Sequence, residues 1–431
     1  MRRYDSYKDS GVEWLGDVPS HWELKRLKQL FVEKKHKQNL SLNCGAISFG
    51  KVIEKDDDKV TEATKRSYQE VLKGEFLINP LNLNYDLISL RIALSEIDVV
   101  VSAGYIVLKA KQIINKKYFS YLLHRYDVAY MKLLGSGVRQ TINYGHISDS
   151  ILVAPPLSEQ QKIAQFLDDK TAKIDQAVDL AEKQIALLKE HKQILIQNAV
   201  TRGLNPDVPL KDSGVEWIGQ VPEHWEVSSL GKILLPVSEK NKPNLPLLSI
   251  TRELGVIERD VEDQESNHNF IPDDLSNYKV LKEGQFGMNK MKAWQGSYGV
   301  SRFTGIVSPA YYIFDFIKSV NSRFFHLAIR SKIYISFFGS ASDGVRIGQW
   351  DLSKSRMKSI PFIIPSYTEQ VQIADYLDQQ AVKIDQAIAL KTAHIEKLKE
   401  YKSVLINDVV TGKVRVLSLI HIRRCRRLVE C

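Results

Sequence analysis

The stretch DSGVEWLGDVPSHWE, residues 9–23, returns almost unchanged as DSGVEWIGQVPEHWE, residues 212–226. The two stretches are identical at twelve of fifteen positions. A repeat of this length at this separation indicates an internal duplication on the scale of a domain. We therefore expect two copies of one fold in the chain.

A second matched pair follows the first. PPLSEQQKIAQFLDDKTAKIDQA begins at Pro155, and PSYTEQVQIADYLDQQAVKIDQA begins at Pro365. Each continues into a lysine-rich helical pattern that ends near Thr201 or Thr411. The predicted order is therefore globular block, long helix, globular block, long helix.

The middles of the two globular blocks have diverged, and only islands match. LKGEFLIN from Leu72 faces LKEGQFGMN from Leu281, and the Gly-Val-Arg of 137–139 faces that of 344–346. Near-identical ends with divergent middles predict one scaffold that does two versions of the same job. That pattern suits recognition better than shared chemistry.

Both long helices carry apolar residues at a heptad spacing, which is typical of a coiled-coil seam. The predicted seam consists of Leu167, Ile174, Ile185, Leu188 and Leu195 in the first helix and Leu377, Ile384, Ile388, Ile395, Leu398 and Leu405 in the second. A lone helix spanning on the order of 60 Å would leave this seam in water. Because the chain returns through the second block, we expect an antiparallel pair that acts as a rod. Lys192 and Lys402 fall at matching seam positions and either specify register or extend out of the seam.

Short β-rich runs, 99–108 and 305–316, alternate with helical stretches, 117–134 and 320–338, so the predicted fold class is α+β. We expect two similar globular domains separated by two long antiparallel coiled-coil helices in a pseudo-two-fold duplication. The predicted boundaries are 1–156 and 205–365 for the domains, 157–204 and 366–413 for the helices, and 414–431 for a tail.

Length and composition agree with a soluble two-domain protein. The chain has 431 residues and three cysteines, and 44% of its residues are hydrophobic. No apolar run approaches the roughly 18 residues that span a membrane, and the polar N-terminus predicts a cytoplasmic location. The segment from about Val416 onward resembles translated cloning sequence; without its four arginines and one glutamate, the formal net charge falls from +9 to +6. This moderate positive charge permits a nucleic-acid partner.

Catalytic and metal-binding motifs are not evident in the sequence. No G-x-x-x-x-G-K-[ST] phosphate loop is found, and Asn79-Pro80-Leu81 fails the Asn/Asp-Pro-Pro-aromatic motif of amino-group DNA methyltransferases. Glu33 and Lys35 have a nuclease-like spacing but lie in a charged run. His21 and His224 repeat within G-x-V-P-x-H-W, which we interpret as a packed turn that opens each domain.

Taken together, the two motif pairs resemble the specificity subunit of type I restriction-modification systems along nearly the whole chain except the tail. The resemblance implies a subunit that reads a split, asymmetric DNA site and catalyses nothing. Two methyltransferase subunits and a restriction subunit would dock on it and would hold the S-adenosylmethionine, ATP and magnesium. The alternatives are an assembly scaffold that reads no sequence and a self-contained methylase or nuclease.

The resemblance also places a Gly-x-Arg-like loop before the last strand of each domain. In that loop we expect Arg139, Gln140 and Asn143 in the first copy, and Arg346 and Gln349 in the second, to contact DNA. The alternative is that the arginine of each loop shapes a turn and bonds a carboxylate. Base-reading candidates from the divergent positions are Lys65, Arg66, Asn82, Asn84, Arg91, Arg252, Lys290, Lys292 and Arg302.

Overall fold

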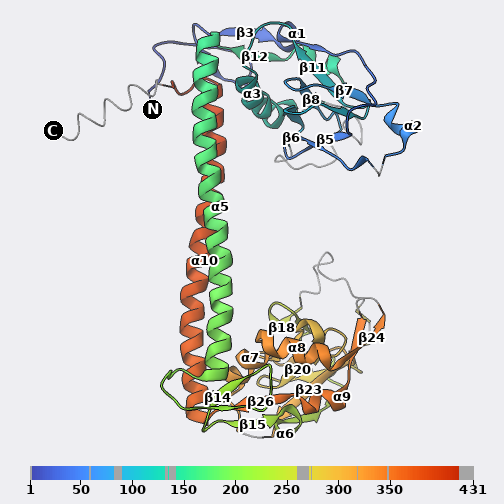
Figure 1. The fold of residues 1–431 in the computed structure, drawn as a ribbon, viewed down its shortest axis with the longest axis vertical. Helices are drawn as coiled ribbons and strands as arrows, with labels where there is room; N and C mark the ends of the chain where they lie inside the picture. The colour runs from blue at the N-terminus through green and yellow to red at the C-terminus, as the bar shows by residue number, and fades with distance from the viewer. Residues whose placement is uncertain are drawn as a thin grey trace, which may run out of the picture. The chain divides into compact units, whose positions relative to one another are not determined.

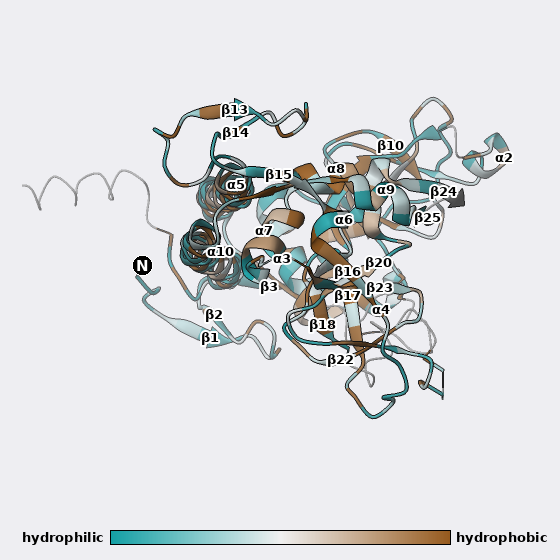
Figure 2. Ribbon diagram, turned by 90° about the horizontal axis from the view of Figure 1, so that it is seen from below, coloured by the Kyte–Doolittle hydropathy of each residue, from teal (hydrophilic) through white to brown (hydrophobic). Residues whose placement is uncertain are grey.

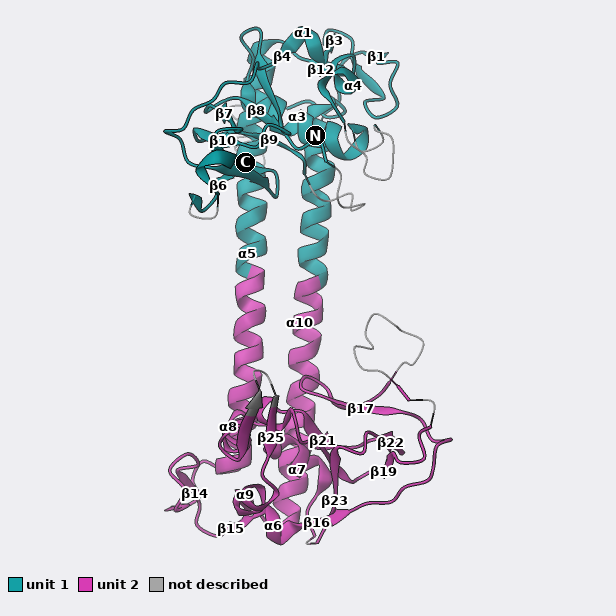
Figure 3. Cartoon of the chain, turned by 90° about the vertical axis from the view of Figure 1, so that its right-hand side faces the viewer, with its two compact units in different colours: residues 1–180, 393–431 teal, residues 181–392 magenta. Residues whose placement is uncertain are grey.

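The chain forms two compact units in the computed structural model (Figure 3). Unit 1 consists of residues 1–180 and 393–431, and unit 2 of residues 181–392. The structure describes residues 2–57, 60–81, 90–131, 134, 142–259, 271–272, 274–317, 319–346 and 349–416. Each unit therefore contains one globular domain and one part of each long helix.

The domain of unit 1 is built on a four-stranded antiparallel sheet in the order β4-β11-β8-β9 (Figure 1). These strands are β4 (Phe31–Glu33), β8 (Phe76–Ile78), β9 (Ile92–Leu94) and β11 (Ile106–Ala110). The paired strands around it are β1 (Tyr7–Asp9) with β2 (Asp17–Pro19), β3 (Glu23–Arg26) with β12 (Ile151–Ala154), β5 (Gly45–Ser48) with β6 (Lys51–Glu54), and β7 (Gln69–Val71) with β10 (Val99–Val101). The helices are α1 (Leu27–Leu30), α2 (Glu62–Lys65), α3 (Lys116–Ala129) and α4 (Tyr144–Ser148).

Unit 2 repeats this arrangement, with a sheet in the order β16-β23-β20-β21. Its strands are β16 (Leu234–Val237), β20 (Phe286–Asn289), β21 (Tyr298–Val300) and β23 (Tyr311–Phe316). The pairs are β13 (Leu210–Asp212) with β14 (Gln220–Pro222), β15 (Glu226–Ser229) with β26 (Pro361–Ile364), β17 (Leu248–Thr251) with β18 (Gly255–Glu258), β19 (Lys279–Leu281) with β22 (Gly305–Val307), and β24 (Ser342–Arg346) with β25 (Gln349–Leu352). The helices are α6 (Leu230–Ile233), η3 (Ala293–Gln295), α7 (Ser322–Ile329), α8 (Lys332–Ser340) and α9 (Lys354–Ser359).

The predicted helical stretch 320–338 is two helices rather than one. Asn321 caps α7 by accepting a hydrogen bond from the Phe324 backbone N–H. Ser331 then has an extended backbone at the N-cap position of α8, which separates the two helices. An extended residue at this position breaks the helical hydrogen-bond ladder.

The long helices are α5 (Leu157–Arg202) and α10 (Tyr367–Val410). In each unit they contribute to one hydrophobic core together with the globular domain. In unit 1, Leu167 and Ile174 of α5 share a buried cluster with Leu405 and Val409 of α10. In unit 2, Ala199 of α5 belongs to the cluster that contains Ile373 and Leu377 of α10. The opposite ends of the two helices thus pack together within each unit.

Each long helix ends at a glycine with a left-handed backbone that lies against a tryptophan. Gly203 has φ +75°, and a Cβ atom there would lie 3.2 Å from the Trp225 ring. Gly412 has φ +77°, and a Cβ atom there would lie 2.4 Å from Pro19. A side chain is unfavourable at both positions because of the backbone conformation and the close neighbours.

The predicted start of the tail is wrong by three residues. Val414 donates its backbone N–H to the Asp408 carbonyl, and Arg415 forms an antiparallel bridge with Arg2. Val414 and Val416 also pack on the core of unit 1. Residues 414–416 therefore belong to unit 1, because they bridge to its N-terminal segment and pack on its apolar core.

Candidate nucleic-acid interface

The two matched motifs of each copy contact one another through a glutamate. His21 Nε2 lies 2.7 Å from Glu159 Oε1, and Trp22 Nε1 donates to Glu159 Oε2 at 3.1 Å. In unit 2, His224 Nε2 and Trp225 Nε1 lie 2.8 and 3.2 Å from Glu369 Oε1. The histidines of the G-x-V-P-x-H-W turns thus anchor the first turn of each long helix to the opening of the domain.

Burial alone would raise the pKa of Glu159, but hydrogen bonds from His21, Trp22 and Tyr4 lower it below its ordinary value. The carboxylate is therefore held ionised as an acceptor. This is the arrangement of a structural anchor, in which three donors converge on one side chain.

The glutamine that follows each glutamate makes a second anchor, which sequence reasoning missed. Gln160 accepts the backbone N–H of Asn115 at 2.9 Å and donates to the Pro155 carbonyl. Gln370 makes the same two contacts with Asn321 and Pro365. Asn115 and Asn321 are the N-cap residues of α3 and α7. The Glu-Gln pair is thus the joint that fixes each domain to its helix, and its repetition in both copies was the available signal.

All eleven predicted seam residues lie on the buried or half-buried sides of α5 and α10. Leu167 is fully buried, and Leu377, Leu405, Ile395, Ile384 and Ile174 are at most 8% exposed. The two seam lysines each bond an aspartate of the other helix: Lys192 Nζ lies 2.7 Å from Asp385 and Lys402 Nζ lies 2.6 Å from Asp175. They therefore lie at the edge of the helix pair and bond across it, and both alternatives for them, specifying register and extending out of the seam, stay predictions.

Three of the candidate DNA contacts in unit 1 are engaged within the domain itself. Lys65 Nζ bonds Asp57 at 2.6 Å, and Arg66 pairs with Glu62 one turn away on α2. Asn143 caps α4 by accepting the backbone N–H of His146. The structure gives each of these side chains a local role, and their DNA contacts stay predictions.

The structure overturns the prediction that Arg91 reads bases. Its side chain is 5% exposed, and its Nε donates to Asp127 Oδ1 at 3.1 Å in the interior of unit 1. A base-reading side chain must reach the groove of a duplex, so we withdraw Arg91 from the candidates.

The candidates of unit 2 are more accessible. Lys292 and Arg302 are exposed, and Lys290 is half-buried with its Nζ 3.2 Å from Asp351. Arg252 is exposed at the turn between β17 and β18 and pairs with Glu253. The backbones of Arg346 and Gln349 pair across the β24–β25 hairpin, and their side chains lie outside what the structure describes. Asn82, Asn84, Arg139 and Gln140 also lie outside the described residues.

The structure brings together four lysines of unit 2, which we call the lysine cluster: Lys240, Lys279, Lys290 and Lys354. The backbone of Lys240 bridges that of Lys279, and Lys279 Nζ donates to the Tyr311 carbonyl at 2.7 Å. Burial lowers the pKa of Lys279, and the positive charges of Lys240, Lys354 and Lys290 lower it further. Only Lys290 was identified from the sequence, because the four residues come from separate segments.

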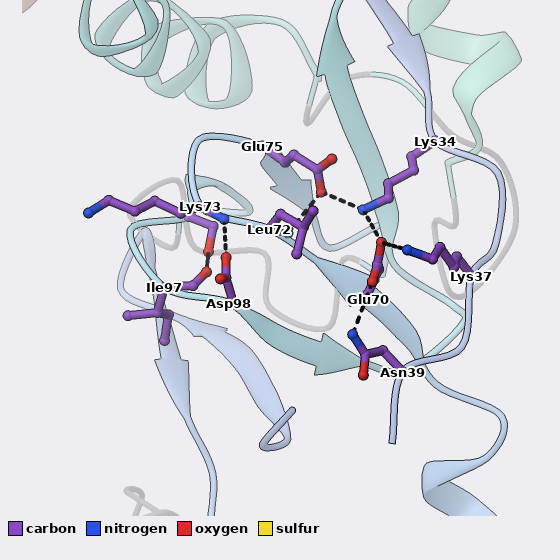
Figure 4. Close-up of polar contacts among 10 residues, drawn as sticks. Lys34, Lys37, Asn39, Glu70, Leu72, Lys73, Glu75, Ile97 and Asp98 are labelled. Carbon is purple, nitrogen blue, oxygen red and sulfur yellow. Dashed lines mark hydrogen bonds and ion pairs between the residues drawn. The ribbon is translucent and has the colours of Figure 1, made fainter. Parts of the chain in front are cut away.

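The corresponding part of unit 1 carries a compensated set of charges (Figure 4). Lys34 Nζ lies 3.2 Å from Glu70 and 2.8 Å from Glu75, and Lys37 Nζ lies 3.0 Å from Glu70. Asn39 donates a further hydrogen bond to Glu70, whose side chain is 3% exposed. These groups neutralise one another, so the two units carry different sets of charges at the same place in one framework.

No group of three histidine, cysteine or acidic side chains arranged to hold a metal ion occurs within the described residues. Among the helices of the same part of the chain, none is long and apolar enough to cross a membrane.

The duplicated α+β fold on two long helices, with the Glu-Gln joint in both copies, defines a class of two-domain recognition subunits. Residues 19–189 match the type I restriction modification DNA specificity domain. The putative type I restriction enzyme MjaX specificity subunit of Methanocaldococcus jannaschii is 25% identical over 93% of this chain and 96% of its own length. The MjaVIII specificity subunit of the same organism is 26% identical over 62% of each chain.

Two solved structures share the fold of this chain. A structure on complex assembly and conformational transition of the type I R-M system aligns with a TM-score of 0.64 at 12% identity, covering 92% of this chain and 99% of its own. The HsdS subunit from Thermoanaerobacter tengcongensis aligns with a TM-score of 0.51 at 14% identity, covering 92% and 98%. Residues 19–189 thus carry a type I restriction modification DNA specificity domain, and the chain is similar along most of its length to specificity subunits of type I restriction enzymes.

Proposed function

We propose that the chain reads a bipartite, asymmetric DNA site, with one half-site recognised by the domain of each unit. The observation that carries this proposal is the contrast between framework and surface. Both units have the same sheet order and the same Glu-Gln joint. The charges on this framework nevertheless differ, with buried, compensated carboxylates beside β7 and the lysine cluster beside β19. One scaffold with two different surfaces suits two different half-sites.

The paired helices α5 and α10 connect the two domains, and we propose that they set the length of the unread gap. The support is the pairing of their apolar seams and the reciprocal bonds of Lys192 and Lys402. A rigid connection fixes half-site spacing, as dimer geometry does in other DNA-binding proteins.

We further propose that two methyltransferase subunits and a restriction subunit dock on this chain. S-adenosylmethionine, ATP and magnesium would then be bound by those partners. The comparison that supports this is the fold shared with the structure on complex assembly of the type I R-M system.

Methylation mapping tests the proposal. The chain is expressed with the methyltransferase subunit encoded beside it, and modified adenines in the host DNA are sequenced. We expect a split asymmetric motif that is methylated only when this chain is present. If the complex assembles but methylates no defined motif, the chain is an assembly scaffold. If the purified chain alone transfers methyl groups, it is a self-contained methylase.

A further inference from the structure

The lysine cluster surrounds two adjacent tyrosines of β23. Lys279 Nζ donates to the Tyr311 carbonyl, and Asn289, the residue before Lys290, donates to the Tyr311 hydroxyl. Lys354 Nζ lies 5.8 Å from the centre of the Tyr312 ring. Strand pairing of Asn289 with Tyr311 and of Lys279 with Lys240 fixes these segments side by side. The cluster is therefore built on the sheet of unit 2 and not on a loose surface segment.

The cluster contains more cationic than anionic groups. Among the described residues, the ion pairs of the four lysines involve one carboxylate, Asp351, which lies 3.2 Å from Lys290 Nζ. Three other lysines act on Lys279 with like charge. Placing like charges together costs stability, so such a surface favours an anion that would offset the repulsion.

Unit 1 has a neutral residue at the position of Lys279. Gln69 Nε2 donates to the Tyr105 carbonyl at 2.7 Å, the same contact that Lys279 Nζ makes with Tyr311. Gln69 pairs with Val101 in the register in which Lys279 pairs with Val307. The hydrogen bond that both residues make therefore does not require a charge. The positive charge of Lys279 is an addition specific to unit 2.

We propose that Lys240, Lys279, Lys290 and Lys354 form a binding site for the phosphodiester backbone of duplex DNA, for which unit 1 has no equivalent at the corresponding strand. Ammonium groups on flexible stems bind phosphate as point charges and carry no base preference. Unit 2 then anchors the complex on DNA by a contact that is independent of sequence, and each domain reads its own half-site beside it. This inference rests on the proposed function, because it assumes that the ligand of unit 2 is DNA.

The variant Lys279→Gln tests the site without removing a structural contact, because the glutamine of unit 1 makes the same hydrogen bond. Lys211→Gln is the matched control: it removes the same charge from β13, which lies beside α5 away from β16, β20 and β23 (Figure 2). Binding of the full chain in complex with the methyltransferase subunit to a fluorescent duplex of random sequence is measured over a range of salt concentrations. Thermal melting confirms that each variant is folded.

We expect Lys279→Gln to reduce the slope of log K against log salt by about one unit, and Lys279→Gln/Lys354→Gln to reduce it by about two. Lys211→Gln should leave the slope unchanged. Slopes equal to that of the control would overturn the inference. So would loss of methyltransferase binding with an unchanged slope, since the cluster would then face a protein. A random duplex requires no knowledge of the target, so failure here leaves the methylation motif, and with it the proposed function, intact.

Discussion

Strands β7 and β19 occupy the same place in the two units, and their surroundings differ in a way that separates framework from recognition. The backbone N–H of Glu70 donates to the Lys37 carbonyl, and that of Val280 donates to the Glu239 carbonyl in the same manner. Around this shared backbone, unit 1 buries Glu70 and Glu75 against Lys34, whereas unit 2 has Val280, Gln285 and Val237. The same framework therefore forms in unit 2 without these interior charges, and what both units retain marks the framework.

The largest effect on stability is expected at contacts that the two units share. Trp22 and Trp225 are at most 1% exposed, and each contacts both a helix start and a helix end. Trp22→Ala and Trp225→Ala should each destabilise their own unit by about 3 to 5 kcal/mol, because each leaves a large cavity and removes one of the hydrogen bonds to the glutamate. Hydrogen exchange measured by mass spectrometry assigns the loss to a unit. Equal loss of protection in both units from either variant would contradict separate frameworks.

A smaller effect is expected where the two units differ. Glu70→Val installs the residue of unit 2 but leaves Lys34 and Lys37 without that partner, which should cost about 2 to 3 kcal/mol. The variant Lys34→Val/Glu70→Val/Glu75→Gln transfers the whole set from unit 2 and should restore stability to within about 1 kcal/mol of the original chain. Urea unfolding measures both. A triple variant no more stable than the single one would show that the charges are part of the framework.

Acid should widen the difference in the free energy of unfolding between the original chain and the triple variant. Burial alone would raise the pKa of Glu70, but hydrogen bonds from Lys37, Asn39 and Lys34 hold it below its ordinary value of 4.5. A lowered pKa in the folded state means that this stabilisation is present above pH 4.5 and is lost as the pH falls through the folded pKa. The original chain should therefore lose more stability below pH 4.5 than the triple variant. If the urea midpoints of the two proteins fall in parallel over this pH range, Glu70 is not the source of the acid sensitivity.

The smallest effect is expected for the bonds between the long helices. Lys192 and Asp385 are partly exposed, with 28% and 58% of their side chains accessible, as are Lys402 and Asp175. A double-mutant cycle on either pair should give a coupling of about 0.5 kcal/mol. The two cycles should agree, because the pairs are related by the duplication. A coupling several times larger in one pair would show that the two ends of the helix pair are not equivalent.

The repeated motifs and the heptads were sufficient to predict the α+β duplication, the long helices and the burial of the seam. The surface of the domains was not predictable in the same way. The islands LKGEFLIN and LKEGQFGMN differ by one residue in length. Their register becomes clear in the structure, where the backbone N–H of Gly74 donates to the Ser95 carbonyl and that of Gly284 to the Ser301 carbonyl. That register places Gln69 with Lys279, which no residue pattern indicated. Arg91 failed as a candidate because exposure depends on packing, and its partner Asp127 lies 36 residues away.

The central claim is that each domain reads its own half-site, and a domain exchange tests it most directly. The domain of residues 205–365 is replaced by a second copy of residues 2–155, so that Pro155 takes the place of Pro365 before the Glu-Gln joint, and methylation is mapped with the same methyltransferase subunit. We predict that one half of the methylated motif is kept and that the other half becomes its inverted copy. An unchanged asymmetric motif would contradict the claim, because the sequence would then be read elsewhere in the complex.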